Sequence, residues 1–216
     1  MRKWNFSPGP ATIPEDVLLE VQSELLEFNN SGISIMEMSH RTELYSSIAF
    51  EAKKDFIEIL NIPDNYEVLF LQGGATHQFS MIPMNFSHLK GKPAYITTGT
   101  WTKRAFEEGS KITEIDQIFS SENENFIYAP HFKDLKIPED ASYVHYCPNE
   151  TIQGVAFDYI PTINNPLVAD MSSSILSEPI DVNKFSLIYA SAQKNIGPSG
   201  LTVVIIKKSF MKQGNQ

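Results

Sequence analysis

The chain has 216 residues, of which 42% are hydrophobic and 20% are charged, and its formal net charge is −9. This size and apolar content favour one globular domain, or one domain and part of a second. The acidic balance argues against non-specific nucleic-acid binding, and no apolar run approaches the ~18 residues that a membrane helix needs.

Compartment and metal content are indicated by a few residue types. The chain has one cysteine, Cys147, so it forms no internal disulfide and fits a reducing compartment. Its first residues lack the apolar stretch of a secretory signal, and we expect a cytoplasmic protein. We expect no bound metal, because the histidines have no CxxC or HExxH partner spacing. They are His40, His77, His88, His131 and His145.

Helices and strands are predicted to alternate along the chain. The first helix begins at Pro14 and carries an apolar stripe to Phe28, and the second runs from about Glu43 to Leu60. Further helices are expected from about residue 76 and over 101–109. Strands are expected over 66–71, 94–97, 142–146, 166–169, 185–190 and 201–206, and residues 120–125 form the best loop candidate.

This alternation predicts an α/β fold with a mostly parallel sheet, in which ligands bind beyond the carboxyl ends of the strands. Small, polar or aromatic residues follow five of the expected strands. These segments are Gly73–Thr76, Gly99–Trp101, Pro148–Thr151, Asp170 and Gln193–Lys194. We therefore expect the five segments to converge on one site.

Lys194 and Asp170 are the most informative pair among these residues. A lysine and an aspartate at the ends of neighbouring strands suit an enzyme that uses pyridoxal phosphate (PLP). The amine would bond to the cofactor, and the carboxylate would pair with the protonated pyridine nitrogen. The alternative is an exposed loop lysine and a helix-capping aspartate.

Gly73–Thr76 stands between a strand and a helix. Small residues let backbone N–H groups approach a phosphate, and a helix N-terminus adds a favourable dipole. An ordinary turn is the alternative. The segment matches neither a P-loop nor GxGxxG, so nucleoside phosphates are not favoured.

Four further features each have two interpretations. Trp101 suits stacking on a flat ring or ordinary core packing. The Thr151 hydroxyl suits a cofactor contact or a turn. His40 and Arg41 suit binding of a carboxylate or phosphate, or a solvated surface pair. Cys147 is interpreted as buried and inert, since no histidine has a suggestive relation to it.

Taken together, five segments resemble the phosphoserine aminotransferase family, which are PLP-dependent enzymes of class V and fold type I. In chain order they are Phe6–Pro10, Met38–Arg41, Leu71–Phe79, His145–Thr151 and Ala190–Pro198. The runs Cys-Pro-Asn-Glu-Thr and Gln-Lys-Asn-Ile-Gly-Pro are the most specific. The resemblance covers essentially the whole chain and implies a three-layer α/β/α large domain of the aspartate-aminotransferase type.

The resemblance implies a role for each residue near the cofactor ring. Lys194 forms the Schiff base with PLP and later moves the proton between the substrate Cα and the cofactor. Asp170 pairs with the pyridine nitrogen. Trp101 stacks on the ring, and Thr151 contacts the side of its phenolic oxygen.

It also implies two sets of anion contacts. Ala75, Thr76 and Gln193 bind the cofactor phosphate. His40 and Arg41 help to bind the acidic substrate, in the partner subunit's site of a homodimer. Some family members carry arginine at the position of Thr76, so other cations must supply that contact here.

The implied reaction is reversible transamination between O-phospho-L-serine plus 2-oxoglutarate and 3-phosphohydroxypyruvate plus L-glutamate, in serine biosynthesis. In some bacteria the family also serves pyridoxine synthesis. Because family members are longer than this chain, we expect residues 1–216 to be the PLP-binding large domain, with residues 1–15 as an N-terminal segment. The C-terminal small domain is expected to be absent.

Three alternatives remain at this point. The first is another class V enzyme, such as a different aminotransferase, a lyase or a desulfurase; Cys147 lacks the setting that a desulfurase needs. The second is a PLP-fold fragment without catalytic activity. The third is a nucleotide- or NAD-binding α/β domain, which would need a phosphate-loop motif that the sequence lacks.

Overall fold

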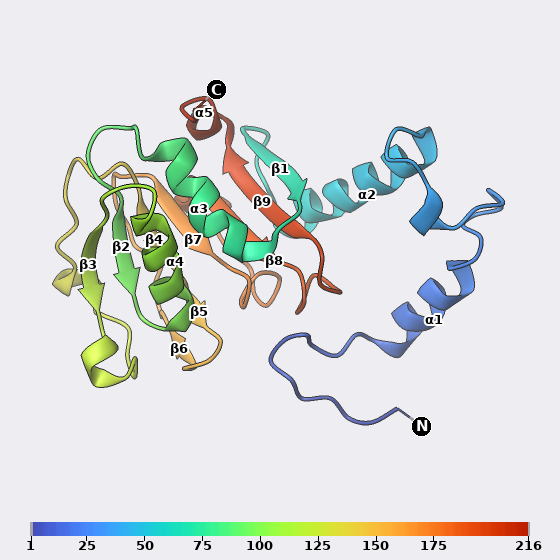
Figure 1. Ribbon diagram of the computed structural model, residues 1–216, viewed down its shortest axis with the longest axis horizontal. Helices are drawn as coiled ribbons and strands as arrows, with labels where there is room; N and C mark the ends of the chain where they lie inside the picture. The colour runs from blue at the N-terminus through green and yellow to red at the C-terminus, as the bar shows by residue number, and fades with distance from the viewer. Residues whose placement is uncertain (1, 216) are drawn as a thin grey trace.

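A mixed β-sheet forms the centre of the computed structural model, which describes residues 2–215. In that range its seven strands lie in the order β1-β9-β8-β7-β4-β2-β3 (Figure 1). They are β1 (Tyr66–Leu71), β2 (Ala94–Thr97), β3 (Asp116–Ser120), β4 (Val144–Tyr146), β7 (Leu167–Asp170), β8 (Leu187–Ser191) and β9 (Thr202–Lys207). Among these strands β9 runs opposite to the other six, and the pairs that do not involve β9 are parallel, so the predicted mostly parallel sheet is confirmed.

Two of the helices cover one face of this sheet. The helices of the described residues are α1 (Glu15–Glu24), α2 (Glu43–Ile59), α3 (Gly74–Phe86), α4 (Thr100–Ser110) and α5 (Lys208–Met211). α3 and α4 lie side by side across one face in Figure 1, and α5 follows β9 at its edge. The aromatic side chains of Phe79, Tyr95, Tyr143 and Tyr189 fill the layer between these helices and the sheet.

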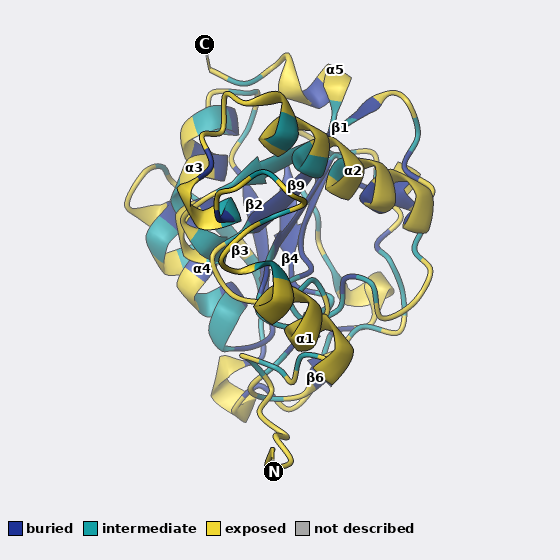
Figure 2. Cartoon of the chain, turned by 90° about the vertical axis from the view of Figure 1, so that its right-hand side faces the viewer, coloured by how far each residue is buried: buried dark blue, intermediate teal, exposed yellow. Residues whose placement is uncertain are grey.

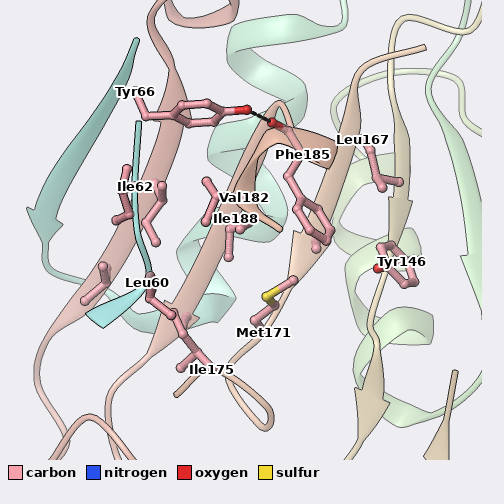
Figure 3. Close-up of a cluster of buried hydrophobic side chains, with 14 of the residues drawn as sticks. Leu60, Ile62, Tyr66, Tyr146, Leu167, Met171, Ile175, Val182, Phe185 and Ile188 are labelled. Atoms are coloured by element: carbon pink, nitrogen blue, oxygen red, sulfur yellow. Dashed lines mark hydrogen bonds between the residues drawn. The ribbon is translucent and has the colours of Figure 1, made fainter. Parts of the chain in front are cut away.

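The opposite face is covered by the end of α2 and by irregular segments. Leu60 and Ile62, which follow α2, belong to the same buried hydrophobic cluster as Val182 and Phe185 (Figure 3). The Tyr66 hydroxyl donates a 2.6 Å hydrogen bond to the backbone carbonyl of Phe185. These layers on both faces of the sheet complete the predicted three-layer α/β/α fold.

Most predicted elements are present, and the missed ones are short or sit at an edge. β3 pairs on one side only, and its sequence Asp-Gln-Ile-Phe-Ser has little apolar alternation. The hairpin of β5 (Asn149–Glu150) and β6 (Val155–Ala156) has two residues in each strand. α3 begins at Gly74 rather than near Thr76, because Gly73 adopts a φ of 94° and starts the helix.

The N-terminal helix lies away from the sheet. α1 has no buried residue, and Figure 2 shows it and much of α2 as exposed. It ends at Glu24 rather than at the predicted Phe28, and Asn29 and Asn30 follow with φ of 51° and 57°. Within residues 2–215, no helix is long and apolar enough to cross a membrane.

Candidate active site

A cavity of about 240 Å³ lies at the carboxyl ends of the parallel strands. Its walls come from the segments that follow β1, β2, β4, β7 and β8. The lining residues are Gly74, Ala75, Thr76, Trp101, Cys147, Asn149, Thr151, Asp170, Ser172, Ser173, Ser191, Gln193 and Lys194. The structure therefore brings together every residue that the sequence predicted at the cofactor.

Lys194 is held in this cavity by a hydrogen bond. It lies three residues beyond the end of β8, and its Nζ donates to the Thr151 hydroxyl at 2.8 Å. The side chain is half-buried, and this burial lowers the pKa of its amine; the negative charge of Asp170 acts in the opposite direction. Burial therefore increases the fraction of neutral amine, which is the nucleophilic and basic form.

Asp170 ends β7 and is buried at the base of the cavity. Its Oδ1 accepts a 2.9 Å hydrogen bond from the backbone N–H of Ser172. Burial raises its pKa to about 6, while hydrogen bonding to Ser172 favours the charged form. A buried carboxylate of this kind fits a protonated ring nitrogen, whose charge would offset the cost of burial.

The N-terminus of α3 opens onto the same cavity. Gly74, Ala75 and Thr76 form its first turn and line the cavity wall. Gly73 precedes them, and a Cβ at that position would lie 1.9 Å from His77 Nδ1. Unpaired N–H groups and the helix dipole make this end of α3 a suitable phosphate site.

The N-terminus of α4 is already filled by a side chain. Glu150, which is fully buried, accepts hydrogen bonds from the Trp101 N–H at 3.0 Å and the Thr102 N–H at 2.9 Å. The Thr102 hydroxyl donates to the same carboxylate at 2.6 Å. A Cβ on Gly99 would lie 2.4 Å from Glu150 Cδ. Glu150 thus fixes Trp101 in the cavity wall and leaves α3 as the helix end available to a phosphate.

His40 and Arg41 are not brought to the cavity. Both are exposed, in the segment between α1 and α2. The Arg41 N–H donates a 3.3 Å hydrogen bond to the Ser39 hydroxyl. Their predicted part in substrate binding stays a prediction.

Besides Glu150, Gly9 and Ala11 contribute to the site without an assigned role in the sequence analysis. Gly9 lies against the catalytic candidate, since a Cβ there would come 3.1 Å from Lys194 Cε, and Ala11 N–H donates to the Gln193 carbonyl at 2.8 Å. The run Ser-Pro-Gly-Pro around Gly9 was the sequence feature that could have indicated this contact.

Cys147 is buried, as predicted, and burial raises the pKa of its thiol, which keeps it protonated.

Metal ligands do not gather at this site. Across residues 2–215, no group of three or more His, Cys, Asp or Glu side chains is placed to hold a metal ion. The polar groups of the cavity are hydroxyls, amides, one amine and one carboxylate, and these suit an organic phosphate ligand.

Comparison with known proteins agrees with this geometry. The chain is 47% identical over 211 residues to the phosphoserine aminotransferase of Hahella chejuensis and 53% identical to that of Bacillus cereus ATCC 10987. The matches cover 97% of this chain but 58% and 59% of those relatives, so the chain spans somewhat under two thirds of their length.

Solved structures give the same result. The phosphoserine aminotransferase of Bacillus circulans subsp. alkalophilus superposes with a TM-score of 0.94 at 42% identity, covering 99% of this chain and 60% of that one. The PLP-bound enzyme of Trichomonas vaginalis gives 0.92 at 39% identity, covering 98% and 60%. Residues 3–215 match the description "Aminotransferase class-V", and the chain belongs to the class V aminotransferase family.

Proposed function

We propose that the cavity binds pyridoxal phosphate through Lys194. The observation that carries this proposal is the placement of one half-buried amine, one buried carboxylate and one open helix N-terminus in a single cavity. When bound, PLP supplies an electron sink that lets a proton leave the Cα of an amino acid. One solved relative is described as PLP-bound and another by its Schiff base.

Each residue that lines the cavity has a separate role in this proposal. Lys194 would bond to the cofactor, and its free amine, positioned by Thr151, would accept and return a proton. Asp170 would supply the negative charge that favours a protonated ring nitrogen. Ala75, Thr76 and Gln193 would hold the phosphate, and Trp101 would offer its ring to the cofactor.

We propose that the protein containing this chain transaminates O-phospho-L-serine with 2-oxoglutarate, giving 3-phosphohydroxypyruvate and L-glutamate in serine biosynthesis. The support is identity of 47% to 53% to relatives named phosphoserine aminotransferase. Residues 1–216 would form its PLP-binding large domain, and His40 and Arg41 would bind the acidic substrate. Its expected location is the cytoplasm.

A homodimer is part of this proposal. Val17, Leu18, Val21 and Leu25 on the α1 segment are between 37% and 55% exposed, which is an unusual amount of apolar surface for one short helix. Sedimentation equilibrium should give a dimer mass, and Val21→Glu should shift it to a monomer. A monomeric wild-type protein would contradict this part of the proposal.

The reaction is tested by incubating the PLP-loaded protein with phosphoserine and 2-oxoglutarate and measuring glutamate. We expect glutamate from phosphoserine but not from serine at the same concentration. Lys194→Ala should abolish turnover, and multiple turnover by that variant would refute the role of this lysine. Equal rates with serine would refute the assigned substrate.

A further inference from the structure

Behind the cavity, a buried tyrosine and histidine continue inward from Asp170. Asp170 on β7 pairs in register with Tyr189 on β8, and His145 lies on β4, the other neighbour of β7. His145 Nε2 lies 2.8 Å from the Tyr189 hydroxyl. All three side chains are buried: Asp170 is 4% exposed, Tyr189 0% and His145 1%. Bulk water therefore does not compete for their hydrogen bonds.

Aromatic packing fixes the imidazole. Tyr95 stacks on His145 at 4.6 Å between ring centroids and 20° between planes, and Tyr189 lies at 5.9 Å and 27°. The Tyr95 hydroxyl pairs with that of Tyr143 at 3.1 Å, which holds the stacking ring in turn. The imidazole therefore has little freedom to turn its other nitrogen toward Tyr189.

The protonation state of His145 limits the possible hydrogen-bond directions. Burial lowers its pKa to about 3, so the ring is neutral near pH 7 and carries one N–H. Among the described residues, Nδ1 has no hydrogen-bond partner. A proton on Nδ1 would be a buried donor without an acceptor, whereas a proton on Nε2 is donated to Tyr189.

We propose that His145 and Tyr189 form a one-way hydrogen-bond relay toward Asp170. Its first step is the observed 2.8 Å contact, in which Nε2–H donates to the Tyr189 hydroxyl. Its second step is inferred from the strand register: the Tyr189 hydroxyl donates to the carboxylate of Asp170, its register partner on the adjacent strand. His145 and Tyr189 are both positioning residues for Asp170. The Tyr189 hydroxyl can donate only one hydrogen bond, and because it accepts from His145 it donates to the carboxylate rather than to the imidazole. The relay helps to keep Asp170 ionised despite its burial; the importance of that charge to the reaction rests on the proposed function.

The direction of the relay is tested by nuclear magnetic resonance on the chain without cofactor. With ¹⁵N-labelled histidine, His145 should show the pattern of the neutral Nε2–H tautomer, assigned by its loss in His145→Asn. The neutral Nδ1–H tautomer would overturn the relay.

The effect on Asp170 is tested by titrating its ¹³Cγ signal. Tyr189→Phe should raise the midpoint by about one pH unit, since a carboxylate loses one hydrogen bond. Tyr146→Phe is the matched control: it removes another buried hydroxyl of the sheet, one without a partner among the described residues, and should leave the midpoint unchanged. Glu150, Cys147 and Lys194, which also act on this region electrostatically, are the same in both variants.

An unchanged midpoint in Tyr189→Phe, or equal shifts in the two variants, would overturn the relay. Neither readout requires bound cofactor or turnover. Failure of PLP binding would therefore refute the proposed function and leave the relay standing, while a wrong tautomer would refute the relay alone.

Discussion

The amine of Lys194 donates a 2.8 Å hydrogen bond to the hydroxyl of Thr151, a residue 43 positions earlier in the chain. The contact joins the loop after β8 to the hairpin that begins with β5. It directs the amine into the cavity that also contains Asp170. The negative charge of Asp170 therefore acts on the amine of Lys194.

Replacing Asp170 should make Lys194 more reactive. The negative charge of Asp170 raises the pKa of the Lys194 amine, so Asp170→Asn should lower that pKa further below its ordinary value. More of the amine is then neutral at pH 7.5. In a plot of the rate of Lys194 modification by trinitrobenzenesulfonate against pH, the midpoint for the variant should therefore lie at lower pH than for wild type. Asp158→Asn, on a separate surface groove, should leave the midpoint unchanged, and an upward shift for Asp170→Asn would contradict the account.

The same substitution should stabilise the chain without cofactor, in a pH-dependent way. The pKa of Asp170 rises from 3.8 to about 6 on folding, so the folded state binds its proton more tightly and loses stability as pH rises through this window. At 1.36 kcal/mol per pH unit, this corresponds to roughly 3 kcal/mol above pH 7. Urea denaturation should show Asp170→Asn more stable than wild type at pH 7.5 and nearly equal at pH 3.5. Equal stability at both values would show that burial of the charge has no cost.

The start of α3 should tolerate no side chain at Gly73. Its φ of 94° and the 1.9 Å approach of a Cβ to His77 Nδ1 combine backbone strain with a clash. Gly73→Ala should lower the free energy of unfolding by more than ~1 kcal/mol and weaken binding of PLP more than of pyridoxal. Gly32→Ala, at φ 74° with open space around it, isolates the backbone strain. Equal destabilisation by the two variants would show that the contact with His77 is unimportant.

Glu150 should be one of the most sensitive positions in the hairpin. Its carboxylate accepts three hydrogen bonds from the first turn of α4, and its removal would leave buried donors without an acceptor. Glu150→Ala should cost about 3 kcal/mol or more in unfolding free energy. Gln153→Ala removes a more exposed pair of hydrogen bonds to Thr100 and should cost about 1 kcal/mol. If Gln153→Ala were the more damaging change, the assigned importance of Glu150 would be wrong.

The composition of the site could be predicted because its residues follow strand ends, which is local information. Asp170 comes directly after one apolar run and Lys194 lies a few residues beyond another, and parallel strands place their ends at one edge. The role of Glu150 could not be predicted in this way. It depends on a contact 49 positions away, and the sequence around it indicates only a turn.

The N-terminal helix shows a different limit. Its apolar stripe predicts a helix correctly, but helical periodicity does not say what covers the stripe. The structure buries none of it, whereas the equally periodic α2 buries Phe56 near its end against the sheet. Burial of a helix depends on its neighbours in space, which this pattern leaves open.

The most direct test of the central claim is to add PLP to this 216-residue chain, reduce with borohydride and map the labelled peptide. We predict one PLP attached to Lys194, no label there in Lys194→Ala, and unchanged labelling in Lys184→Ala, whose lysine lines a separate groove. Labelling spread equally over surface lysines, or no label on a chain with a folded circular dichroism spectrum, would contradict the claim that these residues build the cofactor site.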